Sequence, residues 1–344
     1  MIFRRLREMG NAMIVVTGGA GYIGSNLALA LLRAGEQVRI VDLRDPVTAR
    51  EAGATWVRAD VRDAAATRNA LDGAEVVYHL AGVISVVGPL GGLVESVNVD
   101  GARVVAETAL AAGARRLVHC SSIHAYDVEK CVGEAVNEES PRAVRQTLPA
   151  YDRSKAGGEA EVRRVVDRGL DAVVVNPSAV IGPIDEGPSR VGQVMRALWR
   201  RRLPALVDGG FDWVDVADVV AGLRAAAERG RTGENYLLSG HRRSFRELAE
   251  IASACAGAPV TRRTAPMWLA RAGAPLCTVI ARRTGTALLP TREALDAVRS
   301  FPTVDRRKAE RELGYTPRPI ETTLSALYAY FRDRGDLGRR RLRS

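Results

Sequence analysis

The chain of 344 residues is 47% hydrophobic and 26% charged, a balance typical of a globular protein that buries a large core. Its net charge is +10, but aromatic residues make up only 5% and no nucleic-acid-binding module is visible, so we expect no nucleic-acid partner. No uncharged apolar run reaches about 18 residues, so we expect no membrane span.

The chain ends, the cysteines and the histidines carry few functional signals. Residues 1–7 are a short basic lead-in without the apolar segment of a secretory signal, and residues 336–344 form a basic tail. The 4 cysteines lie far apart and the 4 histidines lack the spacing of metal ligands, so we predict no disulfide and no metal site. These features are typical of a protein of the reducing cytoplasm.

The first predicted strand, 13–17, is followed by a glycine-rich turn and a helical pattern over 22–34. This order predicts a dinucleotide phosphate site. Gly18 permits a tight turn, Gly21 lets the backbone approach a pyrophosphate, and Gly24 lets the helix pack against the strand. Glycines at this spacing also occur in ordinary strand–helix turns, so the motif needs support from the rest of the chain.

A second buried strand, 37–42, ends in Asp42, a residue placed to accept the ribose hydroxyls of an adenosine. Two like charges roughly 4 Å apart cost roughly 4 kcal/mol at an effective dielectric constant of about 20, so Asp42 should repel a 2′-phosphate. This favours NAD over NADP. Arg44 follows two residues on and is able to pair with a 2′-phosphate, so NADP stays an alternative.

The following segments continue the alternation of strands and helices. Strands are expected near 55–59, 75–80, 115–120 and 171–176, with helices near 63–71, 95–112 and 151–168. Short runs rich in Val, Ile and Leu are typical of a parallel sheet covered on both faces. We therefore predict an α/β fold, a Rossmann-type doubly wound parallel sheet over 1–185, with ligands bound beyond the carboxyl ends of the strands.

After Pro183 the pattern becomes more helical. We predict a smaller substrate-binding lobe over 186–335, with later segments completing part of the sheet. Its expected helices are 189–201, 217–229, 244–256, 266–284, 305–313 and 320–333, and its expected strands lie near 205–208, 213–216 and 236–238.

Tyr151 and Lys155 are four residues apart and so share one face of a predicted helix. A phenol has a pKa near about 10, and lowering it by about 3 units takes roughly 4 kcal/mol, which a nearby ammonium and an oxidised nicotinamide are able to supply. Tyr151 then exchanges a proton with a substrate hydroxyl.

Ser122 directly follows a strand and is able to donate to the substrate carbonyl oxygen. Alone, such residues are usually surface groups or helix caps; their combination behind the glycine turn indicates catalysis.

These motifs together resemble the extended short-chain dehydrogenase/reductase superfamily, of the NAD-dependent epimerase/dehydratase type. The resemblance implies the catalytic residues Ser122, Tyr151 and Lys155, and a homodimer. It places Asp60 and Val61 at the adenine, the segment after the fourth strand behind the pyrophosphate, and Pro177 at the nicotinamide. The full set of implied cofactor contacts is Gly18, Gly21, Tyr22, Ile23, Gly24, Asp42, Leu43, Arg44, Asp60, Val61, Leu80, Ala81, Gly82, Asn98, Ser121, Tyr151, Lys155 and Pro177.

Within this superfamily the segment 174–183 is more similar to the dihydroflavonol-reductase and 3β-hydroxysteroid-dehydrogenase-like branch. Asn176 and Asp212 stand where many nucleotide-sugar enzymes carry arginine. We therefore expect an NAD(P)-dependent oxidoreductase that interconverts an alcohol and a ketone on a small hydrophobic or cyclic substrate. The alternative is a sugar or nucleotide-sugar epimerase/dehydratase with a transient 4-keto intermediate. A protein that binds NAD without turnover is a third possibility, which the intact catalytic residues argue against.

Overall fold

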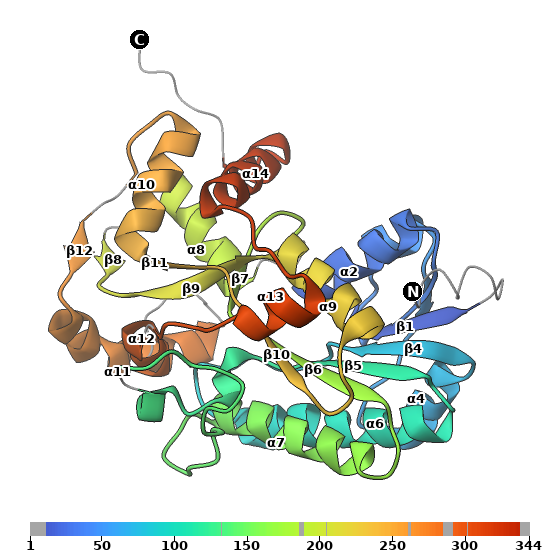
Figure 1. Ribbon diagram of the computed structural model, residues 1–344. Helices are drawn as coiled ribbons and strands as arrows, with labels where there is room; N and C mark the ends of the chain where they lie inside the picture. Colours follow the sequence, from blue (N-terminus) through green and yellow to red (C-terminus); the bar gives the residue numbers. More distant parts are fainter. Residues whose placement is uncertain are drawn as a thin grey trace.

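The computed structural model describes residues 12–131, 133–185, 189–203, 205–260, 263–284, 292–300 and 302–337 (Figure 1). The predicted lead-in and residues 338–344 of the predicted basic tail lie outside this part of the chain.

A seven-stranded parallel sheet with the order β10-β6-β5-β4-β1-β2-β3 forms the centre of the fold. Its strands are β1 (Met13–Thr17), β2 (Gln37–Val41), β3 (Thr55–Val57), β4 (Ala74–His79), β5 (Arg116–Cys120), β6 (Ala172–Pro177) and β10 (Asn235–Leu238). The chain order reverses between β1 and β4, which creates a crevice for a ligand at their carboxyl ends. The predicted doubly wound α/β fold is confirmed.

Helices cover both faces of this sheet (Figure 1). On one face lie α2 (Tyr22–Arg33), α9 (Val216–Arg229) and α13 (Arg307–Leu313), and on the other α4 (Ala64–Leu71), α6 (Gly101–Ala111) and α7 (Ala150–Val166). Side chains of β1 alternate between the two layers: Ile14 and Val16 pack with α2 and α9, whereas Val15 packs with α4 and α6. This explains why the strands are apolar throughout.

The helix predicted over 95–112 is divided in the structure. The pieces are α5 (Leu93–Glu95), a π-helical turn η2 (Ser96–Asp100) and α6. Other short elements without a sequence signal are α3 (Val47–Glu51) and the 3₁₀ turns η1 (Leu90–Gly92), η3 (Ile123–Ala125) and η4 (Val128–Cys131). A π-helical turn changes the phase of the helix and often marks a functional position; here it carries Asn98.

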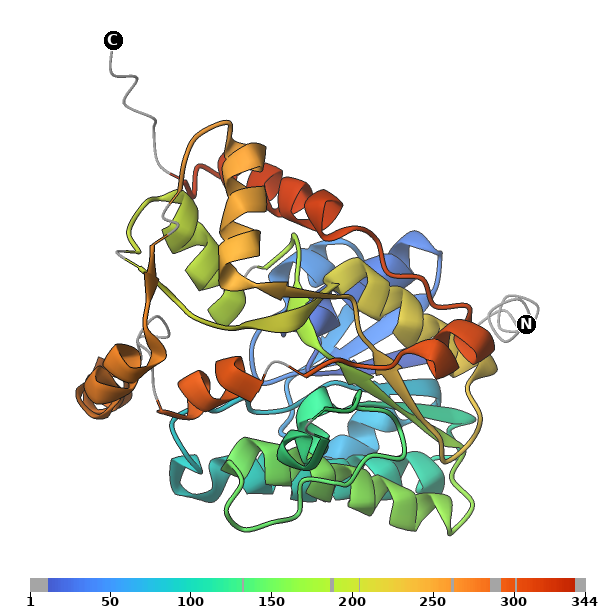
Figure 2. The same cartoon turned by 60° about the vertical axis from the view of Figure 1, so that its left-hand side comes forward.

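The smaller lobe is built on two short sheets, with the orders β11-β9-β7 and β12-β8. Their strands are β7 (Ala179–Ile181), β8 (Leu206–Val207), β9 (Gly210–Asp215), β11 (His241–Ser244) and β12 (Thr264–Ala265). The lobe's helices are α8 (Arg190–Trp199), α10 (Phe245–Ala256), α11 (Met267–Thr284), α12 (Arg292–Ser300) and α14 (Ile320–Asp333). Figure 2 shows α8, α10 and α14 side by side, and Trp199, Leu248 and Phe331 pack together there.

The chain passes between the two lobes several times after residue 185, because α9 and β10 return to the large sheet while β9 and β11 belong to the small one. A lobe boundary at residue 185 therefore remains our proposal, with α9 and β10 counted as part of the large sheet and β7 as part of the small one. None of the helices in the described residues is long and apolar enough to cross a membrane.

Candidate active site

The glycine turn after β1 is shaped by contacts that a side chain would disrupt. Gly18 has a left-handed backbone (φ 71°), and a Cβ there would lie 2.5 Å from the main-chain N of Ala81. A Cβ on Gly24 would lie 2.2 Å from the carbonyl O of Gly18, and one on Gly21 would lie 3.0 Å from the same atom. The tightest contact of Gly24 is therefore with the turn itself, and not with the strand as the sequence led us to expect.

The start of α2 offers main-chain donors to an anion. Its N-cap residue Gly21 has no side chain to cap the helix, and the first turn contains no acidic residue. The N–H groups at a helix start lack partners within the helix and favour negative charge. This cradle, made by Gly18, Gly21, Tyr22, Ile23 and Gly24, fits the pyrophosphate of a dinucleotide.

The carboxylate of Asp42 is held beside the same turn. Its Oδ2 accepts a hydrogen bond from Ala20 N (3.0 Å) and its Oδ1 accepts one from Arg44 N (2.9 Å). The Arg44 guanidinium donates to the carbonyl O of Ala20 (3.0 Å), so this cation also lies at the turn. Leu43, between them, is exposed. Asp42 and Arg44, the two residues that bear on the cofactor preference, thus both lie at the glycine turn. Two main-chain donors orient the Asp42 carboxylate.

Asp60 and Val61 follow β3, where the resemblance places contacts to adenine. Asp60 pairs with Arg62 (2.6 Å), and hydrogen bonds from the Arg62 side chain hold the pKa of this carboxyl below its usual range. Val61 is buried, and a Cβ on Gly101 would lie 2.9 Å from its Cγ2. Because Asp60 is already engaged by Arg62, its contact with adenine stays a prediction.

Asn98 joins the loop after β4 to α7, the helix that carries Tyr151 and Lys155. Its Oδ1 accepts a hydrogen bond from Val83 N (2.8 Å), while its Nδ2 donates to Val83 O (3.0 Å) and to Ser154 Oγ (2.9 Å). A Cβ on Gly82 would lie 3.1 Å from Asn98 Oδ1 and 3.9 Å from Lys155 Nζ, so the loop passes close to the ammonium of Lys155. Asn98 therefore positions this loop, and its contact with the cofactor stays a prediction.

The structure brings the three predicted catalytic residues together where β5 ends against α7. Lys155 is buried, and its Nζ donates to the carbonyl O of Cys120 (3.0 Å). Ser122 follows β5, and its Oγ accepts a hydrogen bond from His124 N (3.2 Å). Tyr151 lies on the first turn of α7, one helical turn before Lys155, and interacts with the Ser122 hydroxyl.

Burial controls the protonation of this cluster. It raises the pKa of Tyr151, and the hydrogen bond with Ser122 opposes this increase only in part. Burial also lowers the pKa of Lys155, although the neighbouring Cys120 and Glu159 favour its charged form. The Tyr151 hydroxyl thus holds its proton at neutral pH, which suits a group that donates a proton to a substrate oxygen.

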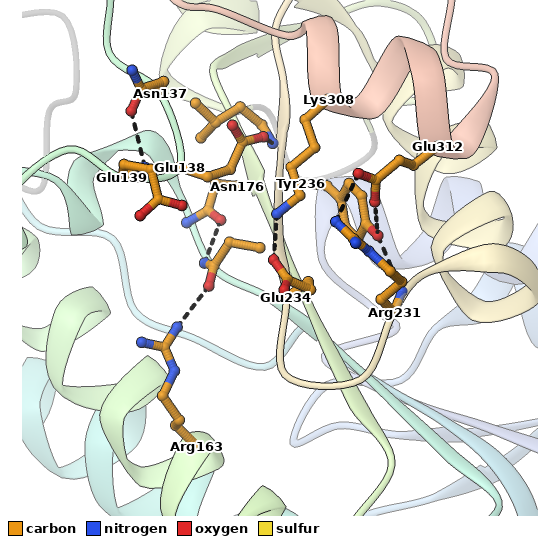
Figure 3. Close-up of polar contacts among 12 residues, drawn as sticks. Asn137, Glu138, Glu139, Arg163, Asn176, Arg231, Glu234, Tyr236, Lys308 and Glu312 are labelled. Carbon is orange, nitrogen blue, oxygen red and sulfur yellow. Dashed lines mark hydrogen bonds and ion pairs between the residues drawn. The ribbon is translucent and has the colours of Figure 1, made fainter.

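A buried polar network beneath Ser122 was not predicted from the sequence. Asn176 Nδ2 donates to Ser122 O (2.9 Å) and to Glu159 Oε1 (2.6 Å). Asn235 Nδ2 donates to Asn176 Oδ1 (2.8 Å) and Glu159 Oε2 (3.1 Å), and Arg163 donates to Asn235 Oδ1 (2.8 Å). Arg163 and Asn176 approach this network from α7 and β6 (Figure 3). The available signal was the position of Glu159, four residues after Lys155 on the same helix face.

Asn176 and Asp212 are the two positions at which many nucleotide-sugar enzymes carry arginine, and we used them to argue against a nucleotide-sugar substrate. The structure shows that both side chains are buried. Asn176 is 1% exposed and its amide is satisfied within the network under Ser122. Asp212 is also buried, and its Oδ1 accepts hydrogen bonds from Ser178 Oγ (2.7 Å) and Gly240 N (2.7 Å). Both side chains are used inside the protein, so the absence of arginine at these positions carries no weight against a diphosphate substrate.

The start of α2 contacts the segment that follows β7. Tyr22 Oη donates to the carbonyl O of Gly182 (2.7 Å), and Asn26 Nδ2 donates to that of Ile184 (3.0 Å). The predicted cofactor residue Pro177 ends β6, close to this junction in sequence. Ser121 is buried and its Oγ has no hydrogen-bond partner among the described residues. An unpaired buried hydroxyl next to Ser122 fits the presence of a bound cofactor.

Comparisons with known proteins show which family the chain resembles. The model of the NAD dependent epimerase/dehydratase family matches residues 14–239. The chain is 34% identical over 325 residues to sterol demethylase protein B of Methylococcus capsulatus, which covers 93% of this chain and 98% of that protein. It is 30% identical over 326 residues to a candidate dihydroflavonol 4-reductase of Synechocystis sp., covering 93% and 94% of the two chains. The crystal structure of gox2253 aligns with a TM-score of 0.81 at 30% identity, covering 95% of this chain and all of that one.

Proposed function

This chain belongs to the NAD dependent epimerase/dehydratase family of the extended short-chain dehydrogenases/reductases, and from that premise we propose that it interconverts an alcohol and a ketone on a small hydrophobic or cyclic substrate. The observation that carries the proposal is the cluster of Ser122, Tyr151 and Lys155 at the carboxyl end of β5. Two relatives that match nearly the whole chain are named for sterol demethylation and for dihydroflavonol reduction, which supports a ring-containing substrate.

NAD is the cofactor of this family, and the residues of this chain fit it. The glycine cradle and the start of α2 would hold the pyrophosphate, Asp42 the adenosine ribose, and Lys155 and Pro177 the nicotinamide end. We favour NAD over NADP because Asp42 is fixed by two main-chain donors beside the turn. When bound, the nicotinamide supplies or accepts the hydride.

The protein's own groups manage the proton. In the direction of reduction, Tyr151 gives its proton to the ketone oxygen, and Ser122 donates a hydrogen bond to the same oxygen as negative charge develops on it. The buried ammonium of Lys155 favours the phenolate that remains on Tyr151. The Asn176 amide holds the main chain of Ser122, so the hydroxyl donor stays in place while the proton moves.

A substrate panel tests this proposal. Purified protein is given NADH with the bicyclic ketones trans-1-decalone and 1-tetralone, or NAD with the corresponding alcohols, and the nicotinamide absorbance is followed. We expect net oxidation or reduction of at least one pair, and Tyr151→Phe should lower kcat by about 100-fold or more while leaving NADH affinity within about threefold.

The control for the tyrosine substitution is Tyr328→Phe on α14, a tyrosine of the smaller lobe outside the catalytic cluster. UDP-glucose is included in the panel with analysis of the sugar product. Conversion of UDP-glucose to another sugar without a net change in cofactor would instead establish the epimerase. Turnover by Tyr151→Phe close to that of the parent protein would remove Tyr151 from the mechanism.

A further inference from the structure

A histidine that the proposed mechanism does not use lies against the catalytic tyrosine. His124 is in the short turn η3, two residues after Ser122, and its N–H donates to the Ser122 hydroxyl (3.2 Å). Its ring lies 5.5 Å from the ring of Tyr151, centroid to centroid, with a tilt of 59°. The same turn therefore carries the catalytic serine and an imidazole in contact with the proton donor.

The imidazole is paired with an acid that is next to the tyrosine in the chain. His124 Nδ1 lies 3.1 Å from Asp152 Oδ1, and the side chains of His124 and Asp152 are 34% and 14% exposed. The ring thus reaches solvent on one side and the catalytic cluster on the other. A tyrosine, a histidine and a carboxylate form one cluster there, of which the proposed mechanism uses only Tyr151.

The other charged group near this cluster belongs to α7. Lys155 lies one turn beyond Tyr151, and its ammonium donates to Cys120 O. From β6 the neutral amide of Asn176 reaches the main chain of Ser122. Within the described residues, Asp152 is the charged group that acts on His124.

The two charge states of this pair act differently on Tyr151. The Asp152 carboxylate repels a phenolate and so raises the pKa of Tyr151, in addition to the larger effect of burial. A protonated His124 neutralises that carboxylate and places a cation beside the phenol ring, which makes release of the proton easier. When His124 is neutral, the charge of Asp152 is no longer compensated, and release of the proton becomes harder.

We infer that His124 and Asp152 form a pH-responsive pair that tunes proton transfer from Tyr151, and that the imidazolium form speeds reduction of a ketone. This inference rests on the proposed function of Tyr151 as the proton donor. His124 acts here as a positioning residue, because its effect passes through Tyr151.

The contacts of His124 favour its imidazolium form. Burial lowers the pKa of His124, but the charge and hydrogen bond of Asp152 raise it by more, so the net pKa lies above the ordinary value for histidine. The imidazolium form is present below this pKa and is lost as the pH rises through it. Ketone reduction should therefore slow as the pH rises through the pKa of His124, and replacing His124 should remove this step.

The first experiment measures kcat/KM for reduction of trans-1-decalone by NADH between about pH 5.5 and 9. In the native protein, kcat/KM should be lower on the alkaline plateau than on the acid plateau by about threefold or more. We expect the pKa of Tyr151 to change by about one to two units when His124 loses its proton, and roughly half of this change should appear in the logarithm of the rate. His124→Asn should lack the step and remain at the lower level. His124→Arg, a permanent cation, should remain at the higher level across the range.

Two further variants check the pairing. Asp152→Asn should keep the step but move its midpoint to lower pH, because the acid that favours the imidazolium is gone. The control His241→Asn removes a histidine of β11 in the smaller lobe and should leave the step in place. A step that survives in His124→Asn, or that does not move in Asp152→Asn, would overturn the inference.

A second readout needs no substrate. The imidazole of His124 is titrated by NMR in the NAD-saturated protein, and the Tyr151 phenolate is titrated by near-ultraviolet absorbance, with Tyr151→Phe as the blank. The phenolate midpoint should be lower in His124→Arg than in His124→Asn by about one unit. Equal midpoints would exclude coupling between the two groups. If the substrate panel fails while these midpoints differ, the coupling stands and only the proposed substrate class is lost.

Discussion

We expect the preference between NAD and NADP to depend on the carboxylate of Asp42, the acid after β2. Asp42 offers two oxygens that are already oriented by the N–H groups of Ala20 and Arg44, whereas the Arg44 side chain is engaged with a carbonyl oxygen. A 2′-phosphate bound at this place would meet the carboxylate first. We therefore expect this carboxylate to favour NAD over NADP.

We predict that Asp42→Asn increases NADPH affinity relative to NADH by about tenfold or more. Removing one of two like charges roughly 4 Å apart relieves a repulsion of roughly 4 kcal/mol at an effective dielectric constant of about 20, part of which solvent already screens. Both cofactors are titrated calorimetrically into the native and variant proteins. Asp45→Asn, an acid three residues on that pairs with Arg50, is the matched control and should leave the ratio unchanged. Tighter binding of NADPH than NADH by the native protein would show that Arg44 controls the pocket.

Elements were predictable to different degrees. The long apolar-periodic segments, such as α2 and α7, and the strands of the large sheet were expected within about two residues of their observed ends. The short strand β7 was missed and the helix predicted over 95–112 was not expected to contain the π-helical turn η2, because three to five residues are too few for a pattern to repeat. The phase change in η2 depends on its packing against α7 and the loop after β4, which no local window contains.

The proximity of Tyr151 and Lys155 was predictable from the local sequence. Tyr151 and Lys155 share one helix, so their spacing carries the information. The network of Asn176, Glu159 and Asn235 comes from β6, α7 and β10, and only the sheet order brings these residues together. Asn176 was misinterpreted because its identity was considered without knowing that its side chain lies under Ser122.

The close contact between Gly24 and the glycine turn at the start of α2 can be tested by substitution. We predict that Gly24→Ala lowers the free energy of unfolding by about 1–3 kcal/mol, because the new Cβ would lie 2.2 Å from Gly18 O and the turn has to shift. NADH affinity should fall as well, since the turn carries the pyrophosphate site. Chemical denaturation and calorimetry measure the two effects.

The matched control is Gly273→Ala in α11, where a Cβ meets nothing within 4 Å. Alanine is the better helix former, so this variant should be as stable as the native protein or more stable by up to about 1 kcal/mol, with unchanged NADH affinity. If Gly24→Ala behaved like Gly273→Ala, the close contact at the turn would have no energetic consequence.

Two histidines lie next to each other at the centre of the large sheet, His79 in β4 and His119 in β5. His79 ends β4, His119 lies in β5, and their rings are 5.2 Å apart at an angle of 31°. His79 Nδ1 shares a hydrogen bond with Thr17 Oγ1 (2.7 Å), whereas neither ring nitrogen of His119 has a partner among the described residues. Both side chains are buried, and burial lowers the pKa of His79 to about 3 and that of His119 well below its ordinary value.

These shifts link folding to pH. In the unfolded chain each histidine binds a proton below about pH 6.5, whereas the folded protein keeps the pair neutral until far lower pH. The unfolded state therefore binds more protons in this interval. The stability that the pair contributes is fully present above about pH 6.5 and is lost as the pH falls, by about 1.4 kcal/mol per pH unit for each histidine.

We predict that His119→Leu makes the free energy of unfolding less dependent on pH between about pH 6 and 4.5. The variant should take up nearly one proton fewer than the native protein when it unfolds. The substitution removes one neutral buried histidine and two ring nitrogens without partners, so it should also not destabilise the protein by more than about 1.5 kcal/mol at pH 7.

Denaturant unfolding is measured at closely spaced pH values, and His241→Leu in β11 is the control, expected to keep the native dependence. Carboxylates contribute equally to all three proteins, so the difference between the slopes isolates His119. Parallel curves for the native protein and His119→Leu would mean that His119 binds its proton equally in the folded and unfolded states, and that its burial is not what makes the sheet sensitive to acid.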